Sequence, residues 1–269
     1  MQGKNALITG AGENIGKSIA LEMAKQGCNV FFTDIEQDRI HQLEEEFRKE
    51  NMADCYGRLS DVGKQEDIED LLRFIDENEV KIDILVNNVG IQYETVSLDD
   101  LDLGEWQRTF ETNVFGPMLL TKHIAQRMRK YSLPGSIIFI TSIHQFEPVR
   151  WPSYSSSKAA LGMIIKELAI ELAKHKIRVN GIAPGWTGKD QEGKLFYEKY
   201  SLLQQSSVDP CYIGRAAVYL AADYFSRFTT GTVLKIDGGT SLYNNRVDAI
   251  RQSSASPIFK FFHHFKYKI

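Results

Sequence analysis

The stretch SIIFITSIHQFEPVRWPSYSSSK, from Ser136 to Lys158, decides the fold of this chain together with AALGMIIKELAIELAK (159–174). Its first five residues are an apolar, β-branched run that predicts a buried strand, and residues 159–174 have the apolar spacing of a helix. Ser142 therefore leaves the tip of a strand, whereas Tyr154 and Lys158 enter a helix. Because residues four apart lie on one helix face, the Tyr154 phenol and the Lys158 ammonium lie side by side.

This pairing of a phenol with an ammonium has a chemical use. A free phenol titrates near pH ~10, and an adjacent fixed cation favours the phenolate, which brings the group toward the working range of a general acid or base. A Tyr and a Lys at this spacing also occur by chance in many helices, so the pairing needs support from the rest of the chain.

The remainder of the chain alternates predicted strands with predicted helices. We expect strands over 5–9, 29–33, 55–61, 82–88, 136–140, 178–183 and 232–236. We expect helices after the glycine turn that follows Thr9, over 35–51, 65–79 and 105–130, through the Tyr154 segment, and over 210–222, with a loop containing some helix over 186–207. This alternation predicts a single α/β domain of Rossmann type. Its seven-stranded parallel sheet is doubly wound, with right-handed crossovers and helices on both faces.

The turn between the first strand and the first helix is rich in glycine, TGAGENIG (Thr9 to Gly16). In a doubly wound sheet this turn presents backbone N–H groups and a helix N-terminus to a pyrophosphate. Asp34 ends the second strand, where a carboxylate can accept both ribose hydroxyls of NAD and repels the 2′-phosphate of NADP. Glu13 adds a second negative charge, so NAD is predicted over NADP. Lys17, on the first turn of the helix, is a basic counter-argument.

These residues resemble the active site of the short-chain dehydrogenase/reductase family. The resemblance rests on Ser142, on Tyr154 twelve residues later and on Lys158 four beyond it. In that family the Tyr is the general acid/base, the Lys lowers its pKa and holds the nicotinamide ribose, and the Ser hydrogen-bonds the reacting oxygen. A family Asn that bends its helix and anchors a water is matched by Asn113 in ETNVFGP. The resemblance implies reversible hydride transfer between a secondary alcohol and NAD.

The family's cofactor motifs are matched with two departures. The pattern Thr-Gly-x-x-x-Gly-x-Gly has Asn14 in place of its middle glycine, and Asn tolerates the left-handed backbone better than most residues. The side chain of Asn14 would, however, project close to the phosphates. Asn87-Asn88-Val89-Gly90 carries Val where the family usually has Ala. The cofactor residues implied in this way are Gly10, Gly12, Asn14, Ile15, Gly16, Asp34, Asp61, Val62, Asn88, Gly90, Tyr154, Lys158, Gly185 and Thr187.

Candidate substrate residues come from a narrower resemblance, to sugar and polyol dehydrogenases such as glucose 1-dehydrogenase and gluconate dehydrogenase. The residues that carry it are His144, Glu147 and Trp151-Pro152. Polar side chains could hydrogen-bond hydroxyl groups while an indole stacks on a pyranose face. The candidates are Gln92, His144, Trp151 and Trp186, with Glu94 and Glu147 as further polar groups and 186–207 as a substrate lid.

Other interpretations remain open at this point. The candidate substrate residues could be loop residues that fix local structure. A 3-oxoacyl thioester reductase would have the same fold and active-site residues. Asp34 argues against this alternative, because it favours NAD whereas biosynthetic reductases usually use NADPH. A scaffold protein that binds NAD without turnover belongs to a different functional class.

Composition indicates the class of protein and the compartment in which it is expected. The chain has 269 residues, 43% of them hydrophobic and 25% charged, as expected of one globular domain with a large core. A net charge of -3 gives no indication of a nucleic-acid partner. The three cysteines are scattered without metal-ligand spacing, and we expect reduced thiols and no metal site. The first strand leaves no room for a signal peptide, and no apolar run could span a bilayer, so a cytoplasmic protein is expected.

We expect the domain to occupy residues 1–239, followed by a C-terminal extension over 240–269. The extension carries five basic side chains and one acidic one, and Phe261, Phe262 and Phe265 fall on one helical face. Such a segment is typical of a helix that binds a membrane surface or a partner. Packing on its own domain or on a neighbouring subunit is the alternative. The family resemblance implies a homotetramer.

Overall fold

A single seven-stranded parallel sheet forms the centre of the molecule, in the order β3-β2-β1-β4-β5-β6-β7. The structure is a computed structural model that describes residues 1–93, 98–190 and 192–243. The strands are β1 (Asn5–Thr9), β2 (Asn29–Asp34), β3 (Cys55–Leu59), β4 (Ile84–Asn87), β5 (Gly135–Ile140), β6 (Ile177–Pro184) and β7 (Val233–Ile236). The predicted doubly wound α/β architecture is confirmed.

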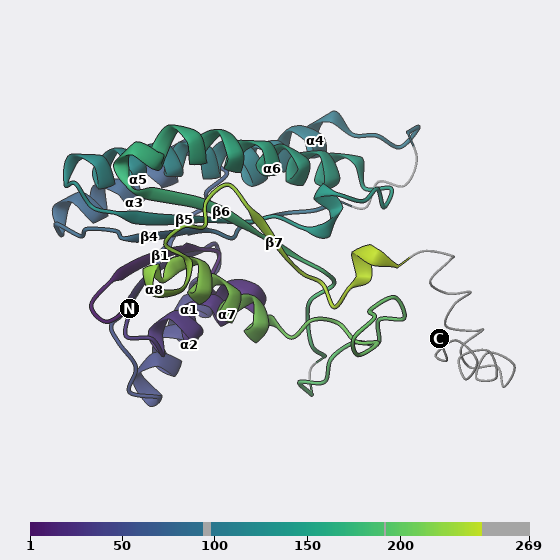
Figure 1. Cartoon of the computed structure of the whole chain (residues 1–269), viewed down its shortest axis with the longest axis horizontal. Coiled ribbons are helices and arrows are strands. Elements are labelled where there is room, and N and C mark those ends of the chain that lie inside the picture. Colours follow the sequence, from purple (N-terminus) through teal and green to yellow (C-terminus); the bar gives the residue numbers. More distant parts are fainter. Residues whose placement is uncertain (94–97, 191, 244–269) are drawn as a thin grey trace, which may run out of the picture.

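Helices cover both faces of the sheet, so the fold has three layers (Figure 1). One face carries α3 (Gln65–Glu77), α5 (Gly116–Lys130) and α6 (Pro152–Leu172), with α4 (Leu103–Phe110) beyond them. The other face carries α1 (Asn14–Ala24), α2 (Gln37–Lys49), α7 (Pro210–Ala221) and the short α8 (Asp223–Ser226).

The alternation of side chains along each strand divides the core in two. Leu7, Phe31 and Leu85 pack with the buried faces of α3, α5 and α6. Ile8 and Phe32 point to the opposite face and pack with α1, α2 and α7. Both sets are almost fully buried, which explains why the central strands are continuous apolar runs rather than alternating ones.

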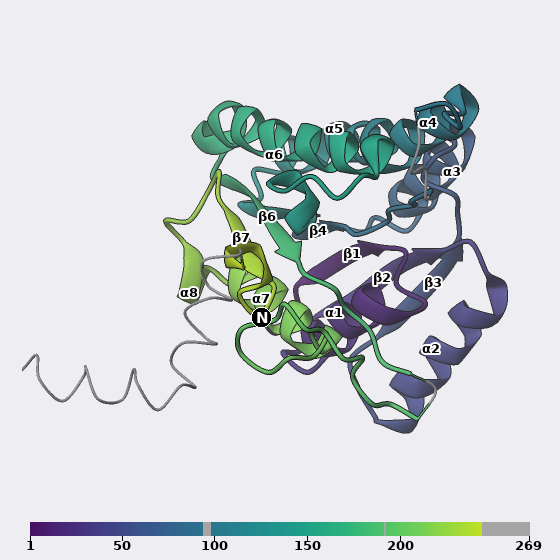
Figure 2. The same cartoon turned by 90° about the vertical axis from the view of Figure 1, so that its right-hand side faces the viewer.

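The strand order reverses at β1, which pairs with β2 on one side and with β4 on the other. Ligands of doubly wound sheets bind at this switch point, outside the carboxyl ends of the strands. The segment that follows β6 lies at that end of the molecule, opposite the N-terminus in Figure 1. Figure 2 shows the same edge with β1, β2 and β3 on one side and β6 and β7 on the other.

The structure differs from the sequence predictions in two helical regions. The expected helix over 105–130 is present, but it is interrupted by a π-helical turn at Glu111–Phe115. In the expected lid, the described residues contain no helix. Isolated β-bridges hold that segment instead, joining Thr187 to Val208 and Tyr197 to Ser206. The helix prediction there was wrong because pairing between distant residues, rather than local periodicity, organises the segment.

The extension beyond Tyr243 and the candidate Glu94 lie outside the described residues. The predictions made for them therefore stay predictions. Among the helices in the described ranges, none combines the length and the hydropathy that crossing a bilayer requires.

Candidate functional site

Tyr154 and Ser142 meet at the carboxyl end of β5. Helix α6 begins at Pro152, a residue suited to the first turn, and so places Tyr154 at its amino end. Ser142 directly precedes the 3-10 turn Ile143–Gln145 and accepts a hydrogen bond from the His144 N–H at 3.2 Å. The Ser142 hydroxyl also hydrogen-bonds the Tyr154 phenol. The strand-end hydroxyl and the helix phenol are thus brought together as predicted.

Lys158 lies one turn further along α6 and is buried, with 2% of its surface exposed. Its Nζ donates a hydrogen bond to the Ile140 carbonyl at 3.0 Å and lies 5.5 Å from the centre of the Tyr154 ring. Burial lowers the pKa of the Lys158 ammonium to about 8. The predicted side-by-side arrangement of phenol and amine is therefore present.

The pKa of Tyr154 moves in the direction opposite to the prediction. The sequence predicts that Lys158 favours the phenolate, yet burial raises the Tyr154 pKa above its ordinary value, and the Ser142 hydrogen bond offsets only part of this. The physical reason is desolvation, which disfavours the charged form of both groups. The phenol is therefore the form favoured at neutral pH.

Asn113 is fully buried in the π-helical turn between α4 and α5. Its Oδ1 accepts from the Ile91 N–H at 2.8 Å, and its Nδ2 donates to the Ile91 carbonyl at 2.9 Å and to Ser157 Oγ at 3.0 Å. The widened turn explains how a polar side chain faces the interior rather than solvent. Asn113 thereby joins the segment after β4 to the residue that precedes Lys158.

Gly90 connects this cluster to the cofactor crevice. A Cβ atom built on Gly90 would lie 2.7 Å from Lys158 Nζ and 3.7 Å from Asn113 Oδ1. The backbone after β4 therefore runs directly against the lysine. Asn88 ties the same segment to the glycine turn, because its Nδ2 donates to the carbonyls of Thr9 and Gly10 at 3.0 and 2.9 Å.

The glycine turn lies against the carboxylate of Asp34. The Gly12 N–H donates to Asp34 Oδ2 at 2.8 Å, and a Cβ at Gly12 would lie only 2.6 Å from the same oxygen. Asn14 has a φ of 45°, so the prediction that an asparagine can hold the left-handed backbone of this turn is confirmed. The Asn14 side chain is exposed.

Lys17, the counter-argument against NAD, forms an ion pair with Glu46 of α2 at 2.6 Å. Its charge is therefore paired with a carboxylate of α2. The charges that act on Asp34 come instead from the residues next to its carboxylate.

The remaining cofactor candidates lie at the ends of β3 and β6. Both oxygens of Asp61 are engaged, one by the Gly63 N–H at 2.9 Å and the other by the Arg108 guanidinium. Val62, next in the chain, is buried. Gly185 donates its N–H to the Ile236 carbonyl, and the Thr187 hydroxyl donates back to the Gly185 carbonyl at 2.9 Å.

The structure brings together some of the substrate candidates and not others. The His144 ring meets the Tyr154 ring edge-on at 5.3 Å and lies 5.2 Å from the Trp151 ring. Burial, assisted by Lys158, lowers the His144 pKa, and its buried Nδ1 has no hydrogen-bond partner in the described part of the chain. Gln92 is exposed, and Trp186 is 60% exposed.

Three residues at the site were missed by sequence reasoning. Arg108 binds Asp61 across the fold, Ser157 accepts a hydrogen bond from Asn113, and Arg39 binds the carboxylates around Asp34. The position of Ser157 directly before Lys158 was a local signal that could have been used. Arg108 pairs with Asp61 and Arg39 with Glu13 across long stretches of sequence, so no local pattern could have identified these two partners, whereas Glu36 lies three residues before Arg39.

The residues at this edge fit a nicotinamide dinucleotide. Glu13, the residue before α1, makes no side-chain capping hydrogen bond to the helix, so within the described part of the chain its first N–H groups are open to a phosphate. Gly12 and Gly90 leave no room for a side chain of their own, because a Cβ would lie 2.6 Å from Asp34 Oδ2 at the first and 2.7 Å from Lys158 Nζ at the second. A carboxylate at one end and a phenol–amine pair at the other complete the donor and acceptor set that such a cofactor requires.

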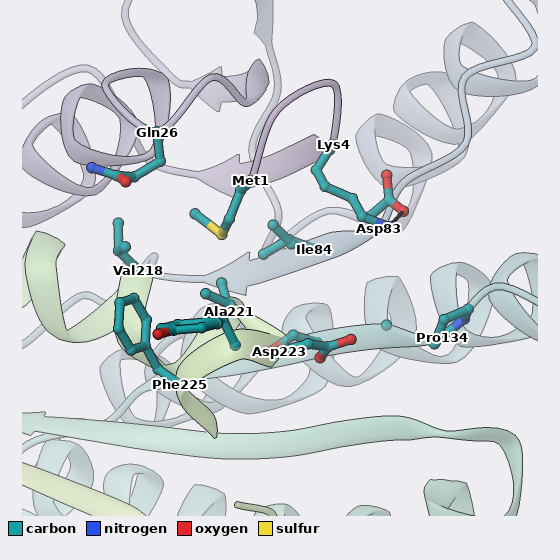
Figure 3. A pocket seen from close by; sticks show the side chains of 14 residues that line it. Met1, Lys4, Gln26, Asp83, Ile84, Pro134, Val218, Ala221, Asp223 and Phe225 are labelled. Atoms are coloured by element: carbon teal, nitrogen blue, oxygen red, sulfur yellow. Dashed lines mark hydrogen bonds and ion pairs between the residues drawn. The ribbon is translucent and has the colours of Figure 1, made fainter. Parts of the chain in front are cut away.

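A separate cavity of about 270 Å³ lies at the opposite edge of the sheet (Figure 3). Met1, Ile84, Val218 and Phe225 surround it, near the amino ends of β1 and β4. The Lys4–Asp83 ion pair at 2.7 Å closes one side. Because the site residues gather at the carboxyl ends of the strands, this cavity does not belong to the candidate site.

Comparison with known proteins gives matches along most of the chain. The short chain dehydrogenase family profile matches residues 4–198. A glucose 1-dehydrogenase of Gluconobacter oxydans (strain 621H) is 30% identical over 253 residues, covering 90% of this chain and 94% of that protein. 3beta-hydroxysteroid dehydrogenase 1 of Eggerthella lenta is 31% identical over 260 residues, covering 90% and 95%.

A solved structure extends the similarity to three dimensions. A gluconate 5-dehydrogenase from Burkholderia cenocepacia J2315, in complex with NADP and tartrate, superposes with a TM-score of 0.81 at 26% identity. The match covers 91% of this chain and 97% of that one.

Proposed function

The chain belongs to the short-chain dehydrogenase family, and from that premise we propose that it is an NAD-dependent dehydrogenase of a secondary alcohol, with a sugar or polyol as the favoured substrate class. Members of the family act on CH–OH groups with a nicotinamide cofactor, and this chain is an oxidoreductase of that kind. The observation that carries the proposal is the convergence of Ser142, Tyr154, Lys158 and Asn113 at the carboxyl end of β5.

In the proposed reaction each of these side chains has a distinct task. The nicotinamide ring, when bound, takes or gives the hydride. Tyr154 removes the hydroxyl proton of the alcohol, or returns it to a ketone, as general base or acid. Ser142 hydrogen-bonds the reacting oxygen as its charge changes. Lys158 supplies positive charge beside Tyr154, and Asn113 holds the backbone at Ile91 against Lys158.

Charge around the adenosine end supports NAD as the cofactor. Asp34 is 5% exposed and accepts N–H groups from Gly12 and Glu36, which holds its oxygens at the turn. Glu13 and Glu36 add negative charge nearby, where a 2′-phosphate would be repelled. The gluconate 5-dehydrogenase relative holds NADP, so its cofactor differs from the one proposed for this chain.

His144 supports a polyhydroxylated substrate. Its Nδ1, which no described residue hydrogen-bonds, and the nearby Trp151 ring offer a hydrogen-bonding group and an apolar face next to Tyr154. The Gluconobacter relative acts on glucose by name, which agrees with this class, whereas the Eggerthella relative is named for a steroid. A steroid presents a large apolar body with few hydroxyl groups, so it would use the hydrogen-bonding group of His144 less than a polyol would.

Two alternatives from the sequence stay open to test. A 3-oxoacyl thioester reductase would use the same four side chains, but in the reductive direction and with NADPH. An NAD-binding scaffold would bind the cofactor without turnover. We also propose that the chain forms a homo-oligomer, consistent with the exposed apolar side chains Met163 and Ile170 on α6.

The substrate proposal is tested by screening the purified protein with NAD against aldoses, polyols, hydroxysteroids and simple secondary alcohols, following NADH absorbance. We expect turnover of an aldose or polyol. We further expect His144→Phe, which keeps an aromatic ring against Tyr154, to raise KM for that substrate about tenfold, as loss of one hydrogen bond would. Turnover confined to steroids, or an unchanged KM in the variant, would contradict the substrate assignment.

The direction of the Tyr154 pKa shift predicts how the rate depends on pH. Oxidation needs the phenolate and reduction needs the phenol, and burial raises the Tyr154 pKa. We therefore expect kcat/KM for alcohol oxidation to rise from pH 6.5 to 8, the range over which Lys158 still carries charge, by at most about tenfold per pH unit. Ketone reduction should stay nearly constant over the same range. Profiles measured in both directions test this, and an oxidation rate independent of pH would contradict it.

A further inference from the structure

Arg39 is surrounded by three carboxylates at the adenosine end of the crevice. Its Nη1 lies 3.0 Å from Glu13 Oε1 and 4.0 Å from Asp34 Oδ1, and its Nη2 lies 3.1 Å from Glu36 Oε1. Glu13 belongs to the glycine turn, Asp34 ends β2, and Glu36 directly precedes α2. One guanidinium therefore links the three chain segments that meet at the predicted ribose site.

The stem of Arg39 packs on the glycine turn itself. A Cβ built on Gly12 would lie 2.6 Å from Arg39 Cβ, the same distance as from Asp34 Oδ2. The Arg39 side chain is 31% exposed, so it is partly accessible to solvent. A planar cation with several N–H donors is well suited to bind a phosphate, provided that its donors are free.

We propose that Arg39 is a cofactor-specificity residue, a latent 2′-phosphate ligand that Glu13, Asp34 and Glu36 keep occupied. The proposal rests on the NAD preference proposed above. With all three carboxylates present, the cluster carries a formal charge of -2 and repels a 2′-phosphate. Neutralising Glu13 and Asp34 leaves Arg39 paired only with Glu36, and frees guanidinium N–H groups to bind the phosphate.

The experiment measures dissociation constants of NADH and NADPH by calorimetry, so that the readout does not depend on turnover. The proteins are the wild type, Arg39→Ala, the double variant Glu13→Gln/Asp34→Ser, and the triple variant that adds Arg39→Ala. We expect the double variant to bind NADPH at least about tenfold more tightly than the wild type, and the triple variant to lose that gain. NADH affinity should be similar in the double and triple variants.

Arg48→Ala in the double background is the matched control, since Arg48 is an exposed arginine near the other end of α2. It should keep the gain in NADPH affinity. Glu13→Gln alone, at a side chain 61% exposed, is the variant least able to disturb folding and should show a smaller gain in the same direction. A triple variant that binds NADPH as tightly as the double would overturn the role of Arg39.

A wild type that prefers NADPH would instead contradict the proposed NAD preference. The Arg39→Ala single variant then separates the two proposals. Loss of NADPH affinity in that variant would still assign Arg39 to the phosphate, although as an active ligand rather than a latent one. Unchanged NADPH affinity would overturn both.

Discussion

Replacing Tyr154 with Phe is expected to lower kcat on the identified substrate by a factor of about 10² to 10⁴, the range that a positioned general acid or base contributes. The substitution removes only the phenolic oxygen. The ring keeps its edge contact with His144 at 5.3 Å and its position 5.5 Å from Lys158 Nζ. Because Phe keeps the size and shape of the ring, we expect the fold and cofactor binding to be retained.

The measurement compares kcat and the NADH dissociation constant in wild type and variant. Tyr131→Phe serves as the control, because Tyr131 is also an aromatic residue beside lysines, Lys81 and Lys130, but lies away from the site. That variant should keep wild-type turnover. If Tyr154→Phe turned over the substrate as fast as the wild type, the tyrosine would not be the acid/base, and the scaffold interpretation would gain support.

Replacing Lys158 with Met is expected to abolish turnover and to stabilise the fold at neutral pH. Lys158 is 2% exposed, and burial lowers its pKa to about 8. Holding it charged at pH 7 therefore costs about 3 kcal/mol relative to the unfolded chain. The substitution also removes the hydrogen bond that Lys158 donates to the Ile140 carbonyl, and this loss offsets part of the gain in stability. We expect a net increase of about 1 to 2 kcal/mol in the free energy of unfolding.

The pH dependence gives this prediction a specific signature. Because the folded pKa of Lys158 lies below the unfolded one, the destabilisation is fully present below pH 8 and disappears as the pH rises toward the unfolded value. Cys28 and Cys55 act in the opposite sense, since burial raises their pKa values to about 11 and about 12. These thiols are present in both proteins, so the difference between variant and wild type isolates Lys158.

Urea unfolding of both proteins between pH 7 and 10 measures that difference. It should be largest at pH 7 and shrink toward pH 10, while kcat of the variant falls at least about a hundredfold. Lys166→Met, at an exposed lysine of the same helix, is the control and should change neither quantity. A Lys158→Met protein that is less stable than the wild type at pH 7 would show that Lys158 holds the fold together rather than straining it.

Local sequence determined the elements of this protein and the identity of most site candidates. Apolar runs and helical spacing predicted all seven strands and the longer helices that cover them, though not the short α8, because a strand buried on both faces and a helix buried on one each leave a recognisable apolar pattern in the sequence. The sequence also predicted the glycine turn, including the left-handed backbone at Asn14, because the residue types that tolerate a positive φ are few. The spacing of Tyr154 and Lys158 on one helix needed no tertiary information.

Only the tertiary structure determined the pKa shifts and ion pairs of the site and the conformation of the segment after β6. The Tyr154 pKa rises because the folded chain excludes water from it, a property that no spacing of residues encodes. The guanidinium of Arg39 meets Glu13 only because the ends of β1 and β2 come together in the sheet. Likewise the segment after β6 is held by bridges such as Thr187 to Val208, not by its own periodicity. Periodicity reports which side of an element is buried, whereas burial depth and charge pairing depend on residues that only folding makes neighbours.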